Sequence, residues 1–319
     1  METRELPKRQ QTPNAQRLAA IVDEALGLLE HSRVPSTTDF ASGTPATLLE
    51  QCRELCAEYE AKSEEPVRII HHLACTGGTL ITKCLCAMPN TQVLSEVDPL
   101  SPLPTKSSKP SFAPSDMITL VRQSHKQIDQ NLIIDLFTSN LAIIRKKAAE
   151  SGQRLILRDH AHSHFHTGDS IPVRPDLRSI VNQEFPALSA VTVRHPLDSY
   201  LSLKHNNWLH FSPPTLEEYC RRYLVFLDTY EDVSVFKYED FTKEPKMVMC
   251  NLCKALELPY SDDFVDLFSV FRLAGDSGRK GEVIDSRPPR PLDRGTLEAS
   301  QNSASYKILL EWLGYNFRT

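Results

Sequence analysis

The sequence of 319 residues contains no long apolar run and no strong excess of basic residues. A membrane-spanning helix needs about 18 or more consecutive apolar residues, and no such run occurs. The start METRELPKRQQTPNAQ is polar and has no apolar core of a signal peptide. A formal net charge of −5 argues against a general nucleic-acid binder. These absences predict a soluble, cytoplasmic protein that has no membrane span and no nucleic-acid partner.

Signatures of disulfides and of metal sites are also missing. The eight cysteines are spread over the chain, which favours reduced thiols in the cytosol. Cys250 and Cys253 have the C-x-x-C spacing of a zinc site, but no second pair of Cys or His residues is nearby. We therefore expect no metal. With 40% hydrophobic and 24% charged residues and only 11 glycines, the composition is that of an ordinary globular protein.

The first 65 residues differ in pattern from the remainder of the chain. After a polar start that we expect to be disordered, AQRLAAIVDEALGLLEHSR and ATLLEQCRELCAEYEAKSEE carry apolar residues at helical spacing. We interpret residues 1–65 as a helical N-terminal extension. It would pack on the body of the fold or on a second subunit, which would give a homodimer.

Residues 66–319 alternate between short β-rich runs and helical runs, which is typical of an α/β domain with a central, mainly parallel sheet. The expected strands are VRIIHHLA, TQVLS, RLILRDH, LSAVTVRHP and VSVFKYED. The expected helices include TLITKCLCAM, NLIIDLFTSNLAIIRKKAAE, PLDSYLSLKHNNW, LEEYCRRYLVFLDTY and PKMVMCNLCKAL. Two long loops, at 95–116 and 160–176, follow strand ends, where such sheets bind their ligands.

A glycine turn joins the first expected strand to a helix. Gly77 and Gly78 bring bare backbone amides to the helix start, and Thr79 adds a hydroxyl. Such a turn suits an anion such as phosphate, although two glycines can also serve a tight turn by geometry alone. The G-x-x-x-x-G-K-[ST] loop of kinases and ATPases is absent. A small-molecule kinase is therefore a weaker alternative.

A second phosphate site is indicated after the strand LSAVTV. Arg194 directly follows this strand, Pro196 marks the start of a helix, and Ser202 lies eight residues after the arginine. The guanidinium offers a planar fork to a phosphate, and the serine two turns into the helix can add a hydroxyl donor.

Taken together, these motifs and their order resemble the PAPS-dependent sulfotransferases, where PAPS is 3′-phosphoadenosine 5′-phosphosulfate. The resemblance implies a P-loop-like, three-layer α/β fold with PAPS as cosubstrate, PAP as product and no metal. In it, Arg194 and Ser202 would hold the 3′-phosphate, and the 5′-phosphosulfate would bind to the turn CTGGTL, which consists of Cys75, Thr76, Gly77, Gly78, Thr79 and Leu80.

One residue departs from the family pattern. Thr76 stands where these enzymes usually carry a basic residue that stabilises charge on the leaving oxygen. Lys83, one helical turn beyond Thr79, and Arg158 are candidates to supply that charge.

Two further segments resemble the family nearer the C-terminus. Tyr238, in FKYEDFTKEP, matches a residue near the adenine. Arg279, Lys280 and Gly281, in GDSGRKGEV, resemble an element that closes over the 3′-phosphate. Two cations and a free amide suit that role.

Two residues are candidates for the base that takes the proton from the acceptor hydroxyl. Arg158-Asp159-His160 resembles the K-T-H of cytosolic sulfotransferases, which makes His160 the first choice. Glu96 resembles the glutamate base of protein-tyrosine sulfotransferases, but a structural carboxylate paired with Arg158 would explain it equally well. The alternating histidines at 160, 162, 164 and 166 would share one face of an extended segment and suggest a metal. We discount that metal because the family needs none.

The sequence thus predicts transfer of a sulfuryl group from PAPS to a hydroxyl acceptor. Carbohydrate, small alcohol or phenol, and peptide tyrosine all remain open as acceptors. A catalytically impaired nucleotide-binding protein of the same fold is the main alternative, because Thr76 replaces a basic residue.

Overall fold

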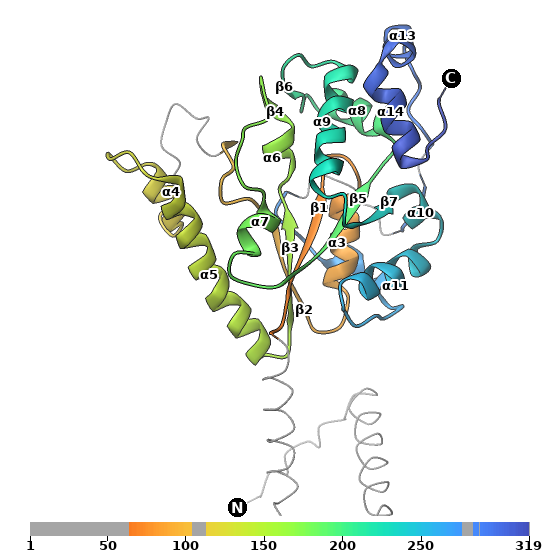
Figure 1. Ribbon diagram of the computed structural model, residues 1–319. Coiled ribbons are helices and arrows are strands. Elements are labelled where there is room, and N and C mark those ends of the chain that lie inside the picture. Colours follow the sequence, from red (N-terminus) through yellow and green to blue (C-terminus); the bar gives the residue numbers. More distant parts are fainter. Residues whose placement is uncertain (1–63, 104–112, 276–282, 287, 319) are drawn as a thin grey trace, which may run out of the picture. The chain divides into compact units, whose positions relative to one another are not determined.

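A computed structural model describes residues 64–103, 113–275, 283–286 and 288–318 of the chain (Figure 1). Nearly all of the expected N-terminal helical extension, residues 1–63, lies outside the described residues. The first described element is the strand β1 (Val67–His72), at the point where the sequence pattern changes.

Five parallel strands form the central sheet. In chain order they are β1, β2 (Thr91–Val97), β3 (Arg154–Asp159), β5 (Ala187–Val193) and β7 (Ser234–Lys237). Their order across the sheet is β2-β3-β1-β5-β7, and every neighbouring pair is parallel. The prediction of an α/β fold with a mainly parallel sheet is confirmed. Because the order reverses at β1, a crevice is expected beyond the carboxyl end of that strand.

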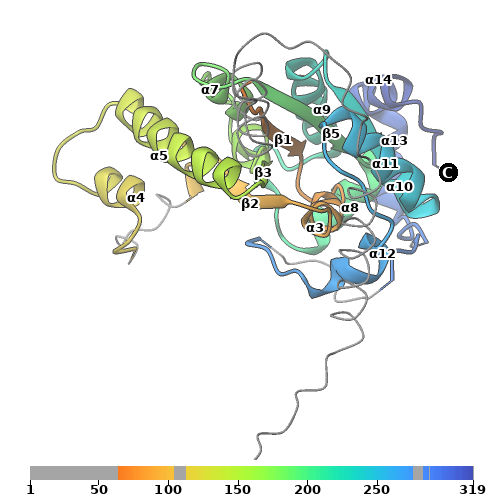
Figure 2. The ribbon, with the colours of Figure 1, turned by 90° about the horizontal axis from the view of Figure 1, so that it is seen from below.

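Helices cover both faces of the sheet. They are α3 (Gly78–Cys86) and α11 (Pro245–Ala255) on one face, and α5 (Gln130–Glu150) and α7 (Leu177–Val181) on the other. Figure 2 shows α3 and α7 on opposite sides of the strands. Val67 and Ile69 pack toward α5 and α7, whereas Ile70 packs toward α3. This alternation follows from the two-residue period of a strand, and burial of both faces explains the nearly continuous apolar run of β1.

A third group of helices packs beside β5. Its members are α8 (Pro196–His205), α9 (Leu216–Thr229) and α14 (Ala304–Leu313). The remaining described elements are α4 (Met117–Arg122), α6 (His162–Phe165), β4 (Thr167–Gly168), β6 (His210–Phe211), α10 (Tyr238–Lys243), α12 (Phe264–Leu267), η2 (Phe268–Val270) and α13 (Arg294–Asn302). None of the helices in the described ranges is long and apolar enough to cross a membrane.

One expected strand is shorter than predicted. The run VSVFKYED was expected to be extended throughout, but β7 ends at Lys237 and α10 begins at Tyr238. Glu239 and Asp240 occupy the first turn of α10, where acidic side chains stabilise a helix start. The change of conformation places Tyr238 at the carboxyl edge of the sheet.

A buried arginine of α9 holds the segment that follows β3. Arg222 is fully buried, and its Nε donates to Glu218 at 2.5 Å. Its remaining nitrogens donate to three backbone carbonyls, those of Phe165, Thr167 and Gly168. These carbonyls have few alternatives in the interior, so the arginine fixes the path of the chain near the candidate site.

We expect Arg222→Met to lower the free energy of unfolding by about 3–5 kcal/mol, because it removes one of the two arginines that bond Glu218 and leaves three buried carbonyls without their donors. Arg221→Met is the matched control. Arg221 is half-exposed and bonds the same Glu218, so its loss should cost at most about 1 kcal/mol. Urea denaturation of both variants measures the difference, and equal costs would contradict the anchoring role of Arg222.

Candidate active site

Segments that follow the carboxyl ends of the parallel strands surround one cavity of about 900 Å³. The predicted residues on its wall are Cys75, Gly77, Gly78, Thr79, Leu80, Glu96, Arg158, His160, Arg194, Ser202 and Tyr238. The sheet therefore brings together residues that lie more than 100 positions apart in the sequence. This is the crevice that the reversal of strand order at β1 leads us to expect.

The two glycines of the turn are required by close packing. Gly77 has φ 89° and caps the N-terminus of α3, and a Cβ atom there would lie 2.2 Å from the ring of Tyr238. A Cβ on Gly78 would lie 2.4 Å from the ring of His72. Both rings can approach the backbone only because neither residue has a side chain. The turn thus places bare amides at the start of a nine-residue helix, beside the cavity.

Thr76 is oriented differently from the rest of the turn. It is fully buried, and its hydroxyl donates to the carbonyl of Leu73 at 2.7 Å. It is not among the residues that line the cavity. Its hydroxyl is therefore directed away from the cavity, and contact of Thr76 with a cosubstrate stays a prediction.

Arg158 places a positive charge at the turn. It is almost fully buried at 3% exposure, and its Nη2 donates to the hydroxyl of Thr79 at 2.8 Å. Its Nε donates to Nε2 of His72 at 2.8 Å, and its Nη1 lies 2.8 Å from Oε1 of Glu96. Burial and the charge of Arg158 hold the pKa of His72 well below its usual range, so this imidazole is neutral and can accept the bond.

Lys83 also lines the cavity, and it is buried within α3. Both residues that the sequence suggested as replacements for the missing basic residue therefore lie at the cavity. Of the two, Arg158 makes the hydrogen bond to the turn itself.

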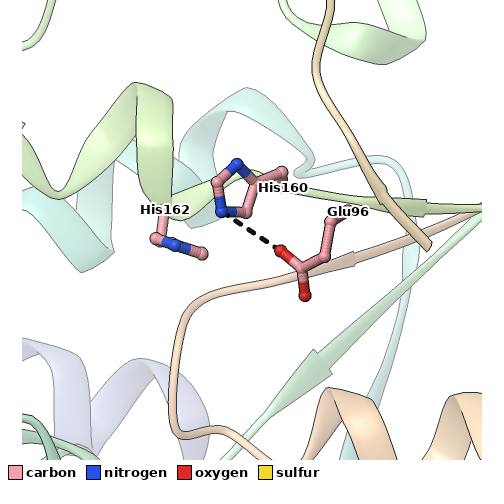
Figure 3. A group of neighbouring side chains, drawn as sticks. All are labelled: Glu96, His160 and His162. Atoms are coloured by element: carbon pink, nitrogen blue, oxygen red, sulfur yellow. Dashed lines mark ion pairs between the residues drawn. The ribbon is translucent and has the colours of Figure 1, made fainter. Parts of the chain in front are cut away.

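The two candidate bases are in contact (Figure 3). Oε2 of Glu96 lies 3.1 Å from Nε2 of His160, while Oε1 of the same carboxylate faces Arg158. Glu96 has φ 63° and lies at a register irregularity of β2, between Ser95 and Val97. Such bulges often redirect a side chain beside a functional site. A carboxylate can only accept, so in this contact a neutral His160 carries its hydrogen on Nε2 and its lone pair on Nδ1.

The four alternating histidines at 160, 162, 164 and 166 do not share one face of an extended segment. Residues after His160 turn into the short helix α6 rather than continuing as extended chain. His164 points to the carbonyl of Pro172 at 3.0 Å and stacks on Phe165. His164 therefore lies in a different environment from His160, His162 and His166, which line the cavity.

His162 and His166, one helical turn apart, both line the cavity. Burial, the largest cause, holds the pKa of His162 well below its usual range, and the neighbouring His160 adds to the effect. Burial also lowers the pKa of His166 to about 3, with a further contribution from Arg222. These rings are neutral at physiological pH.

On another part of the wall, Arg194 lies between the turn and Tyr238. Its Nη1 donates to the carbonyl of Cys75 at 3.3 Å, and its guanidinium carbon lies 5.0 Å from the centre of the Tyr238 ring. Pro196 occupies the first turn of α8, as the sequence predicts. The hydroxyl of Ser202 donates to the carbonyl of Asp198 at 2.8 Å, within the helix.

The predicted residues Arg279, Lys280 and Gly281 lie outside the described residues. A cation that the sequence analysis did not identify, Arg290, lines the cavity. Burial raises the pKa of the Cys75 thiol to about 11, against the opposing charges of Arg194 and Arg290. Arg290 thus acts on the same part of the wall as Arg194. Its segment, SRPPRPLDR, has no motif spacing that would mark it.

No family model matches the sequence, and no curated protein matches it. Solved structures give matches at low identity. The chain is similar in structure to sulfotransferase domains. The sulfotransferase domain from the curacin biosynthetic pathway is 15% identical, with a TM-score of 0.49 over 80% of this chain and 100% of that one.

Two other sulfotransferases give weaker matches. The domain from the Synechococcus PCC 7002 olefin synthase is 15% identical, with a TM-score of 0.46 over 81% of this chain and 98% of that one. Mouse sulfotransferase SULT7A1 complexed with PAP is 12% identical, with a TM-score of 0.40 over 78% of this chain and 90% of that one. At these identities the matches carry no information on ligand or reaction.

We expect Gly77→Ala to destabilise the protein more than Gly152→Ala. Both glycines have positive φ, but a Cβ on Gly152 meets nothing within 4 Å. Gly152→Ala should therefore cost about 1 kcal/mol from backbone strain, and Gly77→Ala about 1–3 kcal/mol more from the clash with Tyr238. Chemical denaturation measures both.

The double variant with Tyr238→Ala separates the two costs. When the ring is absent, the added cost of Gly77→Ala should fall to that of Gly152→Ala. An unchanged cost would contradict the close packing of Tyr238 on the turn.

Proposed function

We propose that this protein transfers a sulfuryl group from PAPS to a hydroxyl of an acceptor and releases PAP. The observation that carries the proposal is the position of Arg158, a buried cation bonded to the glycine turn on one side and to Glu96 on the other. Arg194 lies on the wall of the same cavity, and so does His160. One cavity would thus hold two cations that can bind the phosphates of PAPS, together with a base for the hydroxyl of the acceptor.

In this proposal the 5′-phosphosulfate binds to the turn formed by residues 75–80. The amides at the start of α3 and the hydroxyl of Thr79 donate to its oxygens. Arg158 takes the part of the basic residue that Thr76 does not supply. Because charge accumulates on the oxygen that leaves with the phosphate, a cation fixed in a buried position stabilises the transition state without reorganisation.

The 3′-phosphate binds beside Arg194. Ser202 can donate its hydroxyl by exchanging its bond within α8, and Arg290 adds a second positive charge. Arg279, Lys280 and Gly281 would close over the same phosphate. PAPS carries phosphate at both ends, and in this proposal the ring of Tyr238, which contacts the Arg194 guanidinium, lies near the adenine.

His160 acts as the base, and Glu96 orients it. The acceptor oxygen attacks sulfur while the bond between sulfur and the phosphate oxygen breaks, and His160 takes the hydroxyl proton. Glu96 stabilises the imidazolium that forms, because its carboxylate already lies 3.1 Å from Nε2. The negative charge leaves with PAP, beside Arg158. Trp208 and His210 also line the cavity and are candidates to contact the acceptor, which can be a carbohydrate, a small alcohol or phenol, or a peptide tyrosine.

One observation favours a second candidate function. Thr76 is buried and uncharged, so a protein that binds the nucleotide without turnover would have the same turn. Measured transfer to any hydroxyl acceptor would exclude that alternative. We also propose a cytoplasmic location, consistent with the free thiols among the described cysteines, and pairing of two chains through residues 1–65.

We expect PAP to bind in calorimetric titration, and ATP with magnesium to bind weakly or not at all. Arg194→Met should weaken PAP binding by about ten- to a hundredfold, because a charge-assisted bond to phosphate is lost. Arg294→Met serves as the control, since Arg294 is exposed on α13 and pairs only with Glu298 among the described residues. Unchanged PAP affinity in Arg194→Met would remove Arg194 from the site, and preference for ATP would favour a kinase.

The roles of His160 and Glu96 can be separated by turnover. His160→Ala should keep PAP affinity and lower transfer to a panel of labelled phenol, alcohol, sugar and tyrosine-peptide acceptors by about a hundredfold or more. Glu96→Gln keeps the size of the side chain and should lower transfer less. If His160→Ala retains turnover while Glu96→Gln loses it, Glu96 is the base.

A further inference from the structure

Three side chains at the cavity converge in a way that the proposed transfer reaction does not require. Glu96 comes from β2, His160 follows β3, and His162 begins α6 (Figure 3). One possible ligand atom from each lies within 4.8 Å of the others. In a tetrahedral zinc site, ligand atoms about 2.1 Å from the ion stand roughly 3.4 Å apart. Oε2 of Glu96 and Nε2 of His160, at 3.1 Å, already have nearly that separation.

The surroundings fix the carboxylate in an orientation that suits one metal bond. Arg158 binds Oε1 of Glu96, which leaves Oε2 directed at His160. Gly275 packs against the same carboxylate, where a Cβ atom would lie 2.2 Å from Oε1. Metal-binding carboxylates are commonly held in this way by a hydrogen-bonding neighbour.

An independent observation concerns His162. Its Nδ1 atom is buried and has no hydrogen-bond partner among the described residues. Its ring meets the ring of His160 edge-on, with centroids 3.9 Å apart. A buried ring nitrogen without a partner carries a desolvation cost that a ligand would relieve.

We propose that Glu96, His160 and His162 form a site for a divalent transition metal ion of the zinc class. Two imidazoles and one carboxylate oxygen suit zinc or cobalt, whereas magnesium and calcium prefer a shell of oxygen ligands. The cavity leaves the fourth position to water. Because the Arg158 guanidinium contacts the same carboxylate, its repulsion makes the site weaker than a structural zinc site.

The metal site goes beyond the proposed transfer reaction and does not depend on it. An ion bound at Nε2 of His160 takes the lone pair of that nitrogen, so the single N–H hydrogen of the neutral ring must move from Nε2 to Nδ1. The lone pair that would accept a proton is then absent. Metal binding and the base role of His160 therefore exclude each other, which would make the ion an inhibitor of any reaction that uses this base.

The test is titration of the full-length, reduced protein, freed of metal by chelator and desalting, with zinc chloride in a calorimeter and with cobalt chloride followed by visible absorption. We expect one ion per chain and cobalt absorption of a four-coordinate site with nitrogen and oxygen ligands. No nucleotide is present, so the result is independent of sulfuryl transfer.

Variants locate the ion. His162→Ala should weaken zinc binding by at least about tenfold, and Glu96→Gln should do the same. His125→Ala is the control, because His125 is exposed and lies outside the cavity, and it should bind as the unmodified chain does. If His162→Ala does not fold, as judged by circular dichroism, His162→Gln keeps most of the volume without the imidazole. Absence of binding to the unmodified chain, cobalt absorption typical of thiolate ligands, or unchanged affinity in the His162 and Glu96 variants would each overturn the proposal.

Discussion

The buried guanidinium of Arg158 is the interaction on which the candidate site depends. A charge at 3% exposure is costly unless every donor has a partner, and the partners of Arg158 include residues on three segments around the turn. They are Thr79 at the turn, His72 at the end of β1, and Glu96 with Ser95 on β2. Satisfying one side chain thus fixes the turn, the carboxylate and, through the carboxylate, His160.

That constraint also accounts for the chemistry of the neighbouring residues. His72 must be neutral to accept from Arg158, and its ring occupies the space that the missing side chain of Gly78 provides. Glu96 is held between a fixed cation and an imidazole, so its two oxygens differ in role. In the proposed reaction this arrangement would supply a cation near the leaving oxygen, and in the proposed metal site it would supply one carboxylate oxygen as a ligand. Both proposals depend on the position of Glu96 between Arg158 and His160.

The sequence was sufficient to predict elements with clear periodicity. Strands β1, β3 and β5 and helices α5, α8, α9 and α11 all have a strong apolar pattern, and each occurs where it was expected. The carboxyl-end rule for parallel sheets then placed Arg158, Arg194 and the turn in one cavity.

The local sequence pattern failed where tertiary contacts decide the conformation. The segment after His160 was expected to be a loop, yet it begins with the short helix α6, and Arg222 fixes its path by binding the carbonyls of Phe165, Thr167 and Gly168. The direction of the Thr76 side chain and the position of Arg290 at the cavity also depend on tertiary contacts, which the spacing of residues in the sequence does not reveal.

The most direct test of this account is a crystal structure of the protein with PAP. We predict that the 5′-phosphate lies at the amides of Gly78 and Thr79, with Arg158 within hydrogen-bond distance, and that the 3′-phosphate lies beside Arg194. A nucleotide bound in the opposite direction, or bound outside the cavity while Arg158 contacts only Thr79, His72 and Glu96, would contradict the central claim that Arg158 replaces the missing basic residue of the turn.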